Sequence, residues 1–397
     1  MYLKNLELKN YRNYDHIKLE FNKESILLVG NNGNGKTNLL EAVHYISTGR
    51  SHRTHFQDEL IKWGRDHFLL RGTIVSGNGR KKHLVEIEAG NKNTIKIKVD
   101  GVYRRKKTDF ISILPSVIFS PDDLKIIKAE PGERRAFMDS ILEIIQKDFS
   151  SIRLQYQKIL AQRNSLLKSA AGRLKDSHLR TLGAWNQNLV RYGMEIIARR
   201  LELIESVKKA FAGHMGDFLK GAVPGIRYIY SWERNNLCAG AAGEKPFILP
   251  GSSTGAAVID RERLALIFRR RLEEDLEQDL IRKATAAGPH RDDIAISLGG
   301  RDIRSFGSQG QQRIAAVSLR LCQIQVIKDS LSTDPVLLLD DVLSELDMER
   351  RKKLAGVIKG RFQTFVTTAD MGYLDSLDID FGSRFQVKDD VVTKMGL

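Results

Sequence analysis

The chain has 397 residues, of which 42% are hydrophobic and 28% are charged, so it has the composition of a well-packed soluble protein and not of a disordered one. Its 64 lysines and arginines outnumber its 49 aspartates and glutamates, which gives a net charge of +15 and a pI near 9.6. This excess predicts a polyanionic partner, with nucleic acid ahead of an anionic membrane surface. No single basic run carries the excess, so we expect a broad binding face instead of a charged tail.

The ends and the cysteines of the chain indicate its compartment. Cys238 and Cys322 lie far apart and have no metal-ligand spacing, and Cys322 has the sequence context of a small core residue. The N-terminus begins with a strand-like alternation and not with a signal peptide. No apolar stretch approaches the roughly 20 residues of a membrane-spanning helix. The sequence therefore predicts a protein of the reducing cytoplasm with no membrane partner.

The first elements lead into a glycine-rich loop. Residues 2–8 and 17–21 are predicted strands joined by a turn at 10–13, and a third, apolar strand occupies 26–29. The loop follows as Gly30-Asn31-Asn32-Gly33-Asn34-Gly35-Lys36-Thr37, and a helix begins directly after it. A strand, this loop and then a helix form the context that the G-x-x-x-x-G-K-[ST] phosphate loop requires. The alternative is a chance glycine-rich turn.

The chemistry of a phosphate loop assigns a role to each part of this segment. Glycines let the backbone N–H groups point toward a β-phosphate, and the helix N-terminus adds positive partial charge. Lys36 would reach the β- and γ-oxygens, and Thr37 would offer its hydroxyl to Mg²⁺. The sequence thus predicts binding of ATP or GTP by all eight residues from Gly30 to Thr37.

Residues 68–102 alternate between apolar and polar positions and are interrupted by turn signals at 77–79, 90–91 and 100–101. This pattern predicts an antiparallel meander of hairpins. Directly after it, Tyr103-Arg104-Arg105-Lys106-Lys107 is a dense basic cluster. It is either a contact for DNA or a solvated hairpin end.

The middle of the chain is predicted to be helical. Apolar residues three or four apart predict one amphipathic helix over 133–168 and a second over 179–211. A glycine-, alanine- and proline-rich loop over 240–257 precedes a third, charged helix over 261–283. Since strands flank this region on both sides, we expect one α/β nucleotide-binding lobe, 1–125 with 286–397, interrupted by an inserted helical arm, 126–285.

A strand that ends in two aspartates is predicted after the arm. Residues 335–339 form an apolar run that ends in Asp340-Asp341, and 364–368 is another short apolar run. A strand buried on both faces would deliver the two carboxylates beside the phosphate loop. Asp340 would hold Mg²⁺ through water, and Asp341 would polarise the attacking water. Without the phosphate loop, the same residues could simply be a strand ending in a turn.

A third segment, 305–313, precedes a predicted helix over 314–328. Ser308, Gly310 and Gln311 have the residue types of a second phosphate-binding helix start, or of an ordinary N-cap. The order of phosphate loop, glycine-containing helix start and acidic strand resembles the ABC-type ATPases, in which the signature helix of one subunit closes over ATP held by the other. Asp347 then matches the dimer-facing loop of that superfamily. The resemblance implies an α/β ABC-type P-loop ATPase head, with a mixed sheet, flanking helices and an antiparallel meander, carrying an inserted α-helical arm lobe.

Within that superfamily the chain resembles the RecF family of bacterial recombination mediators. The motifs that carry this resemblance appear in the family's order at 8–14, 49–54, 119–124, 132–139, 288–293, 306–313 and 337–347. Only about 213–282 lacks a recognisable motif.

The resemblance implies a cytosolic protein that dimerises on ATP and binds single-stranded DNA and gapped or junction-containing duplex. It further implies cooperation with RecO and RecR to load RecA onto strands coated by single-strand-binding protein, in DNA repair, replication restart and SOS induction.

Two positions depart from the wider ABC pattern. Asp341 stands where glutamate is usual, and Thr368 stands at the switch position where histidine is usual. Both changes should weaken water activation, so we expect a weak, DNA-stimulated ATPase in which ATP times dimer assembly.

Several basic residues keep two interpretations. By the resemblance Arg12 reaches the nucleotide, whereas its alternative is an exposed loop cation. Arg50 and Arg53 either touch phosphate or DNA, or lie in a solvated loop. His290 and Arg291 with Asp292-Asp293 form either a catalytic-looking pair or an internal ion network that braces the arm against the ATPase lobe.

Three other functions fit the sequence less well than a DNA-binding mediator. A transporter ATPase subunit fits poorly with the basic pI and the short arm. A structural clamp of the SMC or Rad50 kind needs long heptad arms with a hinge or a Cys-x-x-Cys hook, which the sequence lacks, and it is the main alternative. A small-molecule kinase leaves the 305–313 segment unexplained.

Overall fold

The computed structural model divides into two units, one of Met1–Asp123 with Ala316–Leu397 and one of Leu124–Ala315. It describes residues 1–76, 79, 81–90, 94–170, 175–219, 221, 223–233, 248–249, 258–372, 374, 377 and 379–396. Cys238 and nearly all of the predicted loop 240–257 lie outside this range. Among the helices in the described ranges, none has both the length and the hydropathy that crossing a bilayer requires.

The first unit contains a six-stranded mixed sheet that brings distant parts of the chain together. Its strand order is β17-β16-β3-β15-β14-β8, and all neighbours are parallel except β16 and β17. The strands span Val391–Lys394 (β17), Phe381–Lys388 (β16), Ser25–Val29 (β3), Thr364–Thr368 (β15), Val336–Asp340 (β14) and Ser116–Phe119 (β8). Every residue of β14 and β15 is buried, as expected for central strands covered on both faces.

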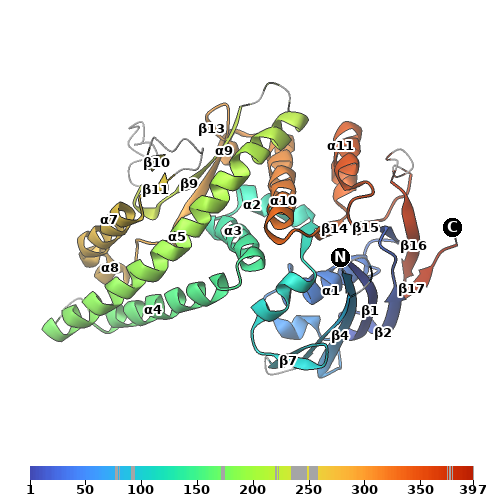
Figure 1. Ribbon diagram of the computed structural model, residues 1–397, viewed down its shortest axis with the longest axis horizontal. Coiled ribbons are helices and arrows are strands. Elements are labelled where there is room, and N and C mark those ends of the chain that lie inside the picture. The colour runs from blue at the N-terminus through green and yellow to red at the C-terminus, as the bar shows by residue number, and fades with distance from the viewer. Residues whose placement is uncertain are drawn as a thin grey trace. The chain divides into compact units, whose positions relative to one another are not determined.

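The second sheet of this unit is the predicted antiparallel meander, extended by the two N-terminal strands. Its order is β2-β1-β4-β5-β6-β7. These strands span Tyr14–Glu20 (β2), Tyr2–Tyr11 (β1), His67–Ser76 (β4), Lys81–Gly90 (β5), Thr94–Val99 (β6) and Val102–Arg104 (β7). Helix α1, Lys36–Thr48, packs against strands of both sheets, so the helix that follows the phosphate loop lies inside this unit (Figure 1).

Two further helices belong wholly or mainly to the first unit. Helix α11 spans Met348–Ile358, and helix α10, Gln309–Leu331, begins in the second unit and continues into the first. Cys322 lies on α10 and is buried, which confirms its prediction as a core residue.

The second unit is built around a long helix, α5, which spans Asp176–Phe218 and packs along α4, Phe149–Ser169. Its other helices are α2 (Leu124–Lys128), α3 (Pro131–Ile145), α7 (Arg261–Glu274), α8 (Leu276–Arg282) and α9 (Ile303–Phe306).

Two of the predicted helices are each divided in the structure. The prediction of a single helix over 133–168 is wrong, because α3 and α4 are separate helices. Arg199 of α5 donates to Gln146 at 3.0 Å and to Asp148 at 2.7 Å, so the segment between the two helices is bound to α5. The helix predicted over 261–283 likewise breaks at Asp275, between α7 and α8.

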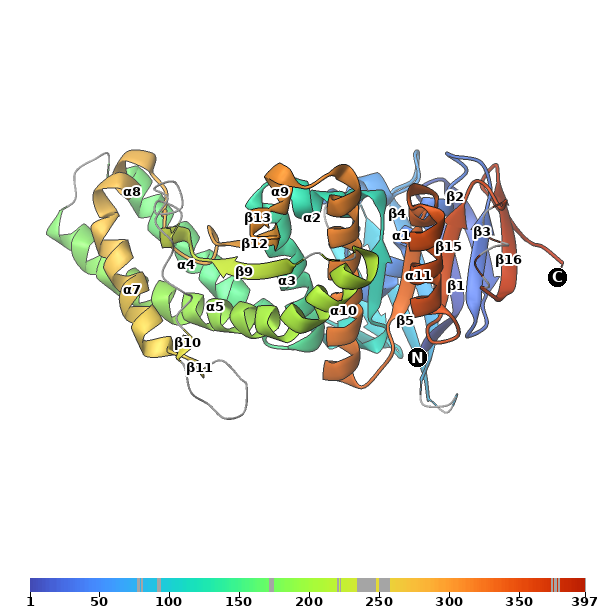
Figure 2. The ribbon, with the colours of Figure 1, turned by 90° about the horizontal axis from the view of Figure 1, so that it is seen from above.

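The second unit also contains a three-stranded antiparallel sheet, β13-β12-β9, which the sequence did not predict. Its strands are Arg301–Asp302 (β13), Asp293–Leu298 (β12) and Pro224–Ile229 (β9), and β9 packs on α5 (Figure 2). A two-stranded pair, β10 (Ile248–Leu249) with β11 (Val258–Ile259), also lies in this unit. Because β12 pairs with β9 over six residues, the segment 286–315 falls in the second unit, whereas the predicted boundary assigned it to the nucleotide-binding lobe.

Candidate nucleotide-binding site

The glycine-rich loop has the backbone of a phosphate loop. Gly33 and Gly35 have φ values of 88° and 94°, a left-handed conformation that costs other residues about 1–2 kcal/mol. The N–H of Asn34 donates to the carbonyl of Asn31 at 3.3 Å, and Leu39 donates to Gly35 at 3.1 Å as α1 begins. The loop therefore turns sharply and ends at a helix N-terminus, which is the backbone arrangement that binds phosphate.

Gly30 is held between two neighbouring strands. Its N–H donates to the carbonyl of Thr368 at 3.3 Å, and a Cβ built on it would lie 2.1 Å from the carbonyl oxygen of Val387 in β16. The side chain of Asn34 donates to the same oxygen at 3.2 Å. No side chain fits at this position, so the close approach of β16 explains why residue 30 is a glycine.

The other end of the loop is held by the turn between β1 and β2. The hydroxyl of Tyr14 donates to the carbonyl of Gly35 at 3.0 Å, and a Cβ at Gly35 would lie 2.5 Å from the Asn13 amide nitrogen. Asn13 in turn accepts a bond from Asn38 of α1 at 2.6 Å. Tyr14 is fully buried, and this burial raises the pKa of its phenol. The β1–β2 turn thereby fixes the loop, a contact that the sequence does not reveal.

The ammonium group of Lys36 points into the loop. Its Nζ donates to the carbonyl oxygens of Gly30 at 2.6 Å and Asn31 at 3.0 Å. Burial lowers the pKa of Lys36, and the negative charges of Asp341 and Asp340 oppose that shift. The lysine thus places a positive charge against the backbone of the loop.

Thr37 in the first turn of α1 and Asp340 at the end of β14 are joined by a hydrogen bond. Thr37 Oγ1 donates to Asp340 Oδ1 at 2.8 Å, and Thr367 Oγ1 donates to the same oxygen at 2.9 Å. Burial raises the pKa of Asp340, as does the charge of Asp341, while the two hydroxyls and Arg53 oppose the shift. Within the described residues, Oδ2 of Asp340 accepts no hydrogen bond. A hydroxyl and a carboxylate are oxygen donors of the kind that Mg²⁺ prefers, so these residues fit the metal.

The two residues that depart from the ABC pattern flank this centre. Asp341 has a left-handed φ of 54°, and its N–H donates to Thr367 Oγ1 at 3.0 Å. Thr368 is fully buried, and its hydroxyl donates to the carbonyl of Asp370 at 2.6 Å. The hydroxyl at the switch position therefore closes a turn after β15.

Arg12 does not match the interpretation as an exposed loop cation. Its side chain is 16% exposed and forms a bidentate pair with the buried Glu41 of α1, at 2.7 and 2.8 Å. It also donates to the carbonyl of Glu59 at 2.8 Å. Arg53, from the neighbouring loop, donates to Asn38 at 2.8 Å. A contact between Arg12 and nucleotide stays a prediction.

The 305–313 segment begins α10 with a capping box. The N–H of Gln311 donates to Ser308 Oγ at 3.3 Å, and the N–H of Ser308 donates to Gln311 Oε1 at 2.8 Å. Ser308 is exposed, Gly310 is half-buried, and the buried Gln312 donates to the carbonyls of Ile303 and Arg304, each at 3.1 Å. The N-cap interpretation thus describes the local geometry, and the exposed hydroxyl leaves a phosphate role untested.

Asp347, the predicted dimer-facing residue, caps α11. It accepts from the N–H of Arg350 at 3.0 Å and pairs with the Arg350 side chain at 3.2 Å. The basic cluster after the meander lies at the edge strand β7, where Tyr103 is 62% exposed under the ammonium of Lys98, 4.8 Å from its ring centre. Both functional assignments stay predictions.

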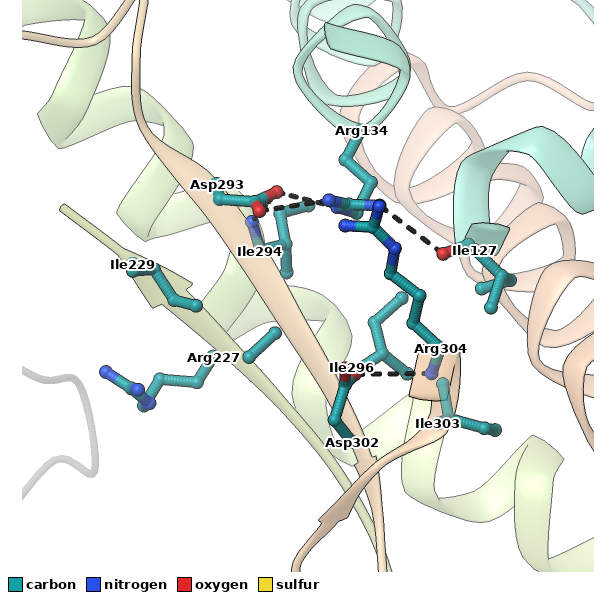
Figure 3. Close-up of a pocket in the computed structure, with 11 residues that line it drawn as sticks. Ile127, Arg134, Arg227, Ile229, Asp293, Ile294, Ile296, Asp302, Ile303 and Arg304 are labelled. Carbon is teal, nitrogen blue, oxygen red and sulfur yellow. Dashed lines mark hydrogen bonds and ion pairs between the residues drawn. The ribbon is translucent and has the colours of Figure 1, made fainter. Parts of the chain in front are cut away.

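The 288–293 motif forms a buried network within the second unit. Asp293 accepts two bonds from Arg134, at 2.6 and 3.0 Å, and Arg134 also donates to the carbonyl of Ala129 at 2.8 Å. Figure 3 shows this pair in a cavity of about 240 Å³ that Ile127, Ile294 and other isoleucines line. The internal ion network therefore accounts for Asp293.

Neighbouring residues of this motif are also satisfied internally. The hydroxyl of Tyr156 donates to His290 Nδ1 at 2.6 Å, and His290 Nε2 lies 3.0 Å from the carbonyl of Thr285. Burial lowers the pKa of His290 to about 4, so the imidazole is neutral at pH 7. The sequence missed two other buried ion pairs of this unit, Arg200 with Asp139 and Arg163 with Asp279, because single charges within helices carry no signal of their partner.

Comparisons with known proteins agree with this architecture. A family model described as the RecF/RecN/SMC N terminal domain matches residues 2–390. The chain is 36% identical over 387 residues to the DNA replication and repair protein RecF of Natranaerobius thermophilus, covering 98% of this chain and 96% of the relative. It is 32% identical over 397 residues to the Bacillus subtilis protein of the same name, covering 99% and 100%.

Solved structures give the same result. A structure of the recombination mediator protein RecF with ATP, in the RecFOR pathway, superposes with a TM-score of 0.86 at 33% identity and covers 100% of this chain and 98% of that one. An SMC head bound to the C-winged helix domain of ScpA, at 16% identity and a TM-score of 0.54, shares the ABC-type ATPase head fold alone. The chain therefore belongs to the RecF family of DNA replication and repair proteins, a branch of the ABC and SMC-like ATPases.

Proposed function

We propose that this protein binds ATP with Mg²⁺ at the phosphate loop and uses the bound nucleotide to control its own dimerisation on DNA. The observation that carries the proposal is the hydrogen bond between Thr37 and Asp340, which joins the phosphate-loop helix to the end of β14 at 2.8 Å. A metal-binding hydroxyl and a carboxylate meet beside a lysine that points into the loop. This combination is the recurring core of P-loop ATPases.

Each group has a role in holding the nucleotide. The loop N–H groups and the N-terminus of α1 would bind phosphate oxygens, and Lys36 would exchange its two loop carbonyls for them. Thr37 and Asp340 would hold Mg²⁺, which supplies neutralisation of phosphate charge when bound. Asp341 would orient water, but it is one methylene shorter than the usual glutamate, and Thr368 supplies no imidazole. We therefore expect slow hydrolysis, so that ATP acts as a timer.

The dimer proposal rests on the exposed start of α10. In ABC-type ATPases the signature helix of one subunit closes over the nucleotide of the other, and Ser308, Gly310 and Gln311 match that helix start. The capping box leaves Ser308 exposed and able to face a second subunit. The net charge of +15 supports DNA as the polyanionic partner, with gapped or junction-containing duplex and single strands as the expected forms.

The pathway follows from the family. The similar RecF structure is described as a recombination mediator in the RecFOR pathway, which supports RecO and RecR as partners here. RecA loading on gapped DNA is then the expected outcome in repair, replication restart and SOS induction.

The first experiment measures molar mass in solution by light scattering, without nucleotide, with ATP and Mg²⁺, and with ATP and a gapped duplex. We expect a monomer that becomes a dimer with ATP and stays on the duplex. A protein that stays monomeric with ATP in both settings would contradict the ATP-controlled dimer.

Two variants separate ATP binding from dimer closure. Lys36→Arg keeps a positive charge in the loop and should retain most ATP binding while slowing hydrolysis and dimer turnover. Ser308→Arg should bind ATP as a monomer and fail to dimerise, because the long side chain occupies the exposed helix start.

Ser308→Ala is the matched control, since it loses the cap without adding bulk, at a cost of about 1 kcal/mol. Dimerisation of Ser308→Arg on ATP would rule out the two-subunit site.

A further inference from the structure

The second unit contains a polar cavity of about 420 Å³ that has no role in the site described above. Helices α7 and α8 line it together with the chain around residues 231–232 and 284–291. Its volume lies within the range of about 300–1,000 Å³ that holds ligands of small-molecule size. All of its lining residues belong to the second unit, whereas the phosphate loop belongs to the first.

Positive charge dominates the lining. Arg271, Arg282 and Arg291 line the cavity with a single acidic residue, Asp275. Arg271 pairs with Glu274 at 3.3 Å. Arg282 and Arg291 are exposed, and neither has an ion-pair partner in the part of the chain that the structure describes. Guanidinium groups bind phosphate and carboxylate oxygens with paired hydrogen bonds, so this lining suits an anionic ligand.

The cavity walls are fixed by the 288–293 motif. Arg291 is exposed between two residues that are not, and its N–H donates to the carbonyl of Gly288 at 2.8 Å. The adjacent Asp292 is fully buried and accepts from the hydroxyl of Tyr228 at 2.6 Å and from the N–H of Ser231 at 2.7 Å. One buried carboxylate thus positions both Arg291 and the chain that carries the next wall.

That next wall is Trp232. Its ring stacks with Tyr230 at 5.0 Å and 10°, and with Phe268 at 5.6 Å and 27°. Two aromatic neighbours hold the indole in one orientation, so it forms a rigid side of the cavity. A binding site with rigid walls loses little entropy when its ligand binds.

We propose that this cavity binds the backbone phosphates of a DNA strand, with Arg282 and Arg291 as the phosphate contacts. The inference rests on the proposed DNA-binding function and assigns one contact region for it in the second unit. A free phosphate or nucleotide shares the same chemistry, and the experiment below separates the two sources.

The test uses the full-length protein with ATP and a fluorescein-labelled single-stranded oligonucleotide, read by anisotropy at several salt concentrations. Arg282→Gln and Arg291→Gln each remove one guanidinium from the cavity. Arg269→Gln is the matched control, since Arg269 is exposed on α7 and outside the cavity. Circular dichroism checks that each variant is folded.

Loss of one phosphate contact should lower the slope of log affinity against log salt by about 0.7 for a single strand. If the variant and the unchanged protein bind equally at 1 M salt, the variant should therefore bind about fivefold more weakly than the unchanged protein at 0.1 M, because a tenfold change in salt changes log affinity by the slope. We expect this change in both cavity variants and a smaller one in Arg269→Gln. If all three variants have the same slope of log affinity against log salt while the unchanged protein binds DNA, the cavity is not the DNA contact. The proposed DNA-binding function would then still stand. No DNA binding by the unchanged protein would overturn both.

A second readout locates the strand directly. The chain has three tryptophans, so replacing Trp63 and Trp185 by phenylalanine leaves Trp232 as the only fluorescent indole. Oligonucleotide should change its fluorescence in the otherwise unaltered cavity and not in an Arg291→Gln background. If inorganic phosphate changes the Trp232 signal and the oligonucleotide does not, the cavity serves a free phosphate and the DNA assignment is wrong.

Discussion

Replacing Gly30 with alanine puts a methyl group where the phosphate loop meets β16. The added Cβ would lie 2.1 Å from the carbonyl oxygen of Val387, and real Cβ atoms essentially never approach closer than 3.0 Å, so the two must separate by at least 3.0 − 2.1 = 0.9 Å. The oxygen belongs to the main chain of β16, whose Gln386 is paired with Val29 of β3. It cannot rotate away as a side chain would, so the loop or the strand must move.

Two measurable effects follow from that displacement. Forcing one methyl group into a packed site costs typically about 1–3 kcal/mol of the free energy of unfolding. The carbonyl of Gly30 also accepts from Lys36 at 2.6 Å, so the lysine shifts with the loop. A displacement of about 1 Å in catalytic groups can lower the rate on the order of 100-fold. We expect a destabilised protein with weakened ATP binding and strongly reduced hydrolysis.

Urea unfolding and titration with a fluorescent ATP analogue measure the two effects separately. Gly356→Ala on α11 is a control in open space, and it should stabilise the protein by about 0.5–1 kcal/mol. Gly33→Ala also meets no neighbour but has φ +88°, so it should show only the strain of about 1–2 kcal/mol. Unchanged stability and ATP affinity in Gly30→Ala would refute the steric explanation of the loop.

Three further predictions concern ionisable groups that are buried or cap a helix. Arg134→Met should destabilise the second unit by about 3–5 kcal/mol, since it removes the cation that pairs with the buried Asp293, and adding Asp293→Leu should recover most of that loss in urea unfolding. Burial lowers the pKa of His290 to about 4, so the unfolded chain binds a proton at this residue more tightly than the folded protein does. As the pH falls from 7 to 4, the unchanged protein should therefore lose about 2–3 kcal/mol more stability than the His290→Gln variant. Equal pH profiles would contradict that shift. Asp347→Ala should lower the free energy of unfolding by about 1 kcal/mol, because it removes the N-cap of α11. Asp347→Asn should retain most of that stability, because asparagine also caps helices.

Features with a strong local signal were predictable from the sequence. The phosphate loop has glycines wherever the backbone is left-handed or crowded, and the apolar run before Asp340 is a central strand with every residue buried. The antiparallel meander could be predicted from the alternation of apolar and polar residues and from the turn residues between its strands. These elements depend on residues within about ten positions of one another, where periodicity and turn chemistry carry the information.

Features set by distant contacts could not be predicted. The break between α3 and α4 contains neither glycine nor proline, and Arg199, some fifty residues later, binds both Gln146 and Asp148 there. The pairing of β9 with β12 joins strands separated by about 64 residues, so the association of 293–298 with β9 has no local signal in the sequence. Likewise the roles of Tyr14 in holding the loop and of Arg12 in pairing with Glu41 depend on tertiary packing.

The cost of burying Asp292 bears on the function of the second unit. Burial raises the pKa of this carboxyl to about 6 from the usual 3.8, so the contribution of Asp292 to stability is most favourable below pH 3.8 and is lost as the pH rises through 6. At pH 7 the ionised group costs about 3 kcal/mol, by the conversion of about 1.4 kcal/mol per pKa unit. Asp293 beside it pairs with Arg134. Asp292 accepts from a hydroxyl and a backbone N–H, and these bonds and the charge of Arg200 lower its pKa by less than burial raises it. Sites that retain such a local cost are typically functional, and what this carboxylate positions is Arg291 and the chain leading to Trp232.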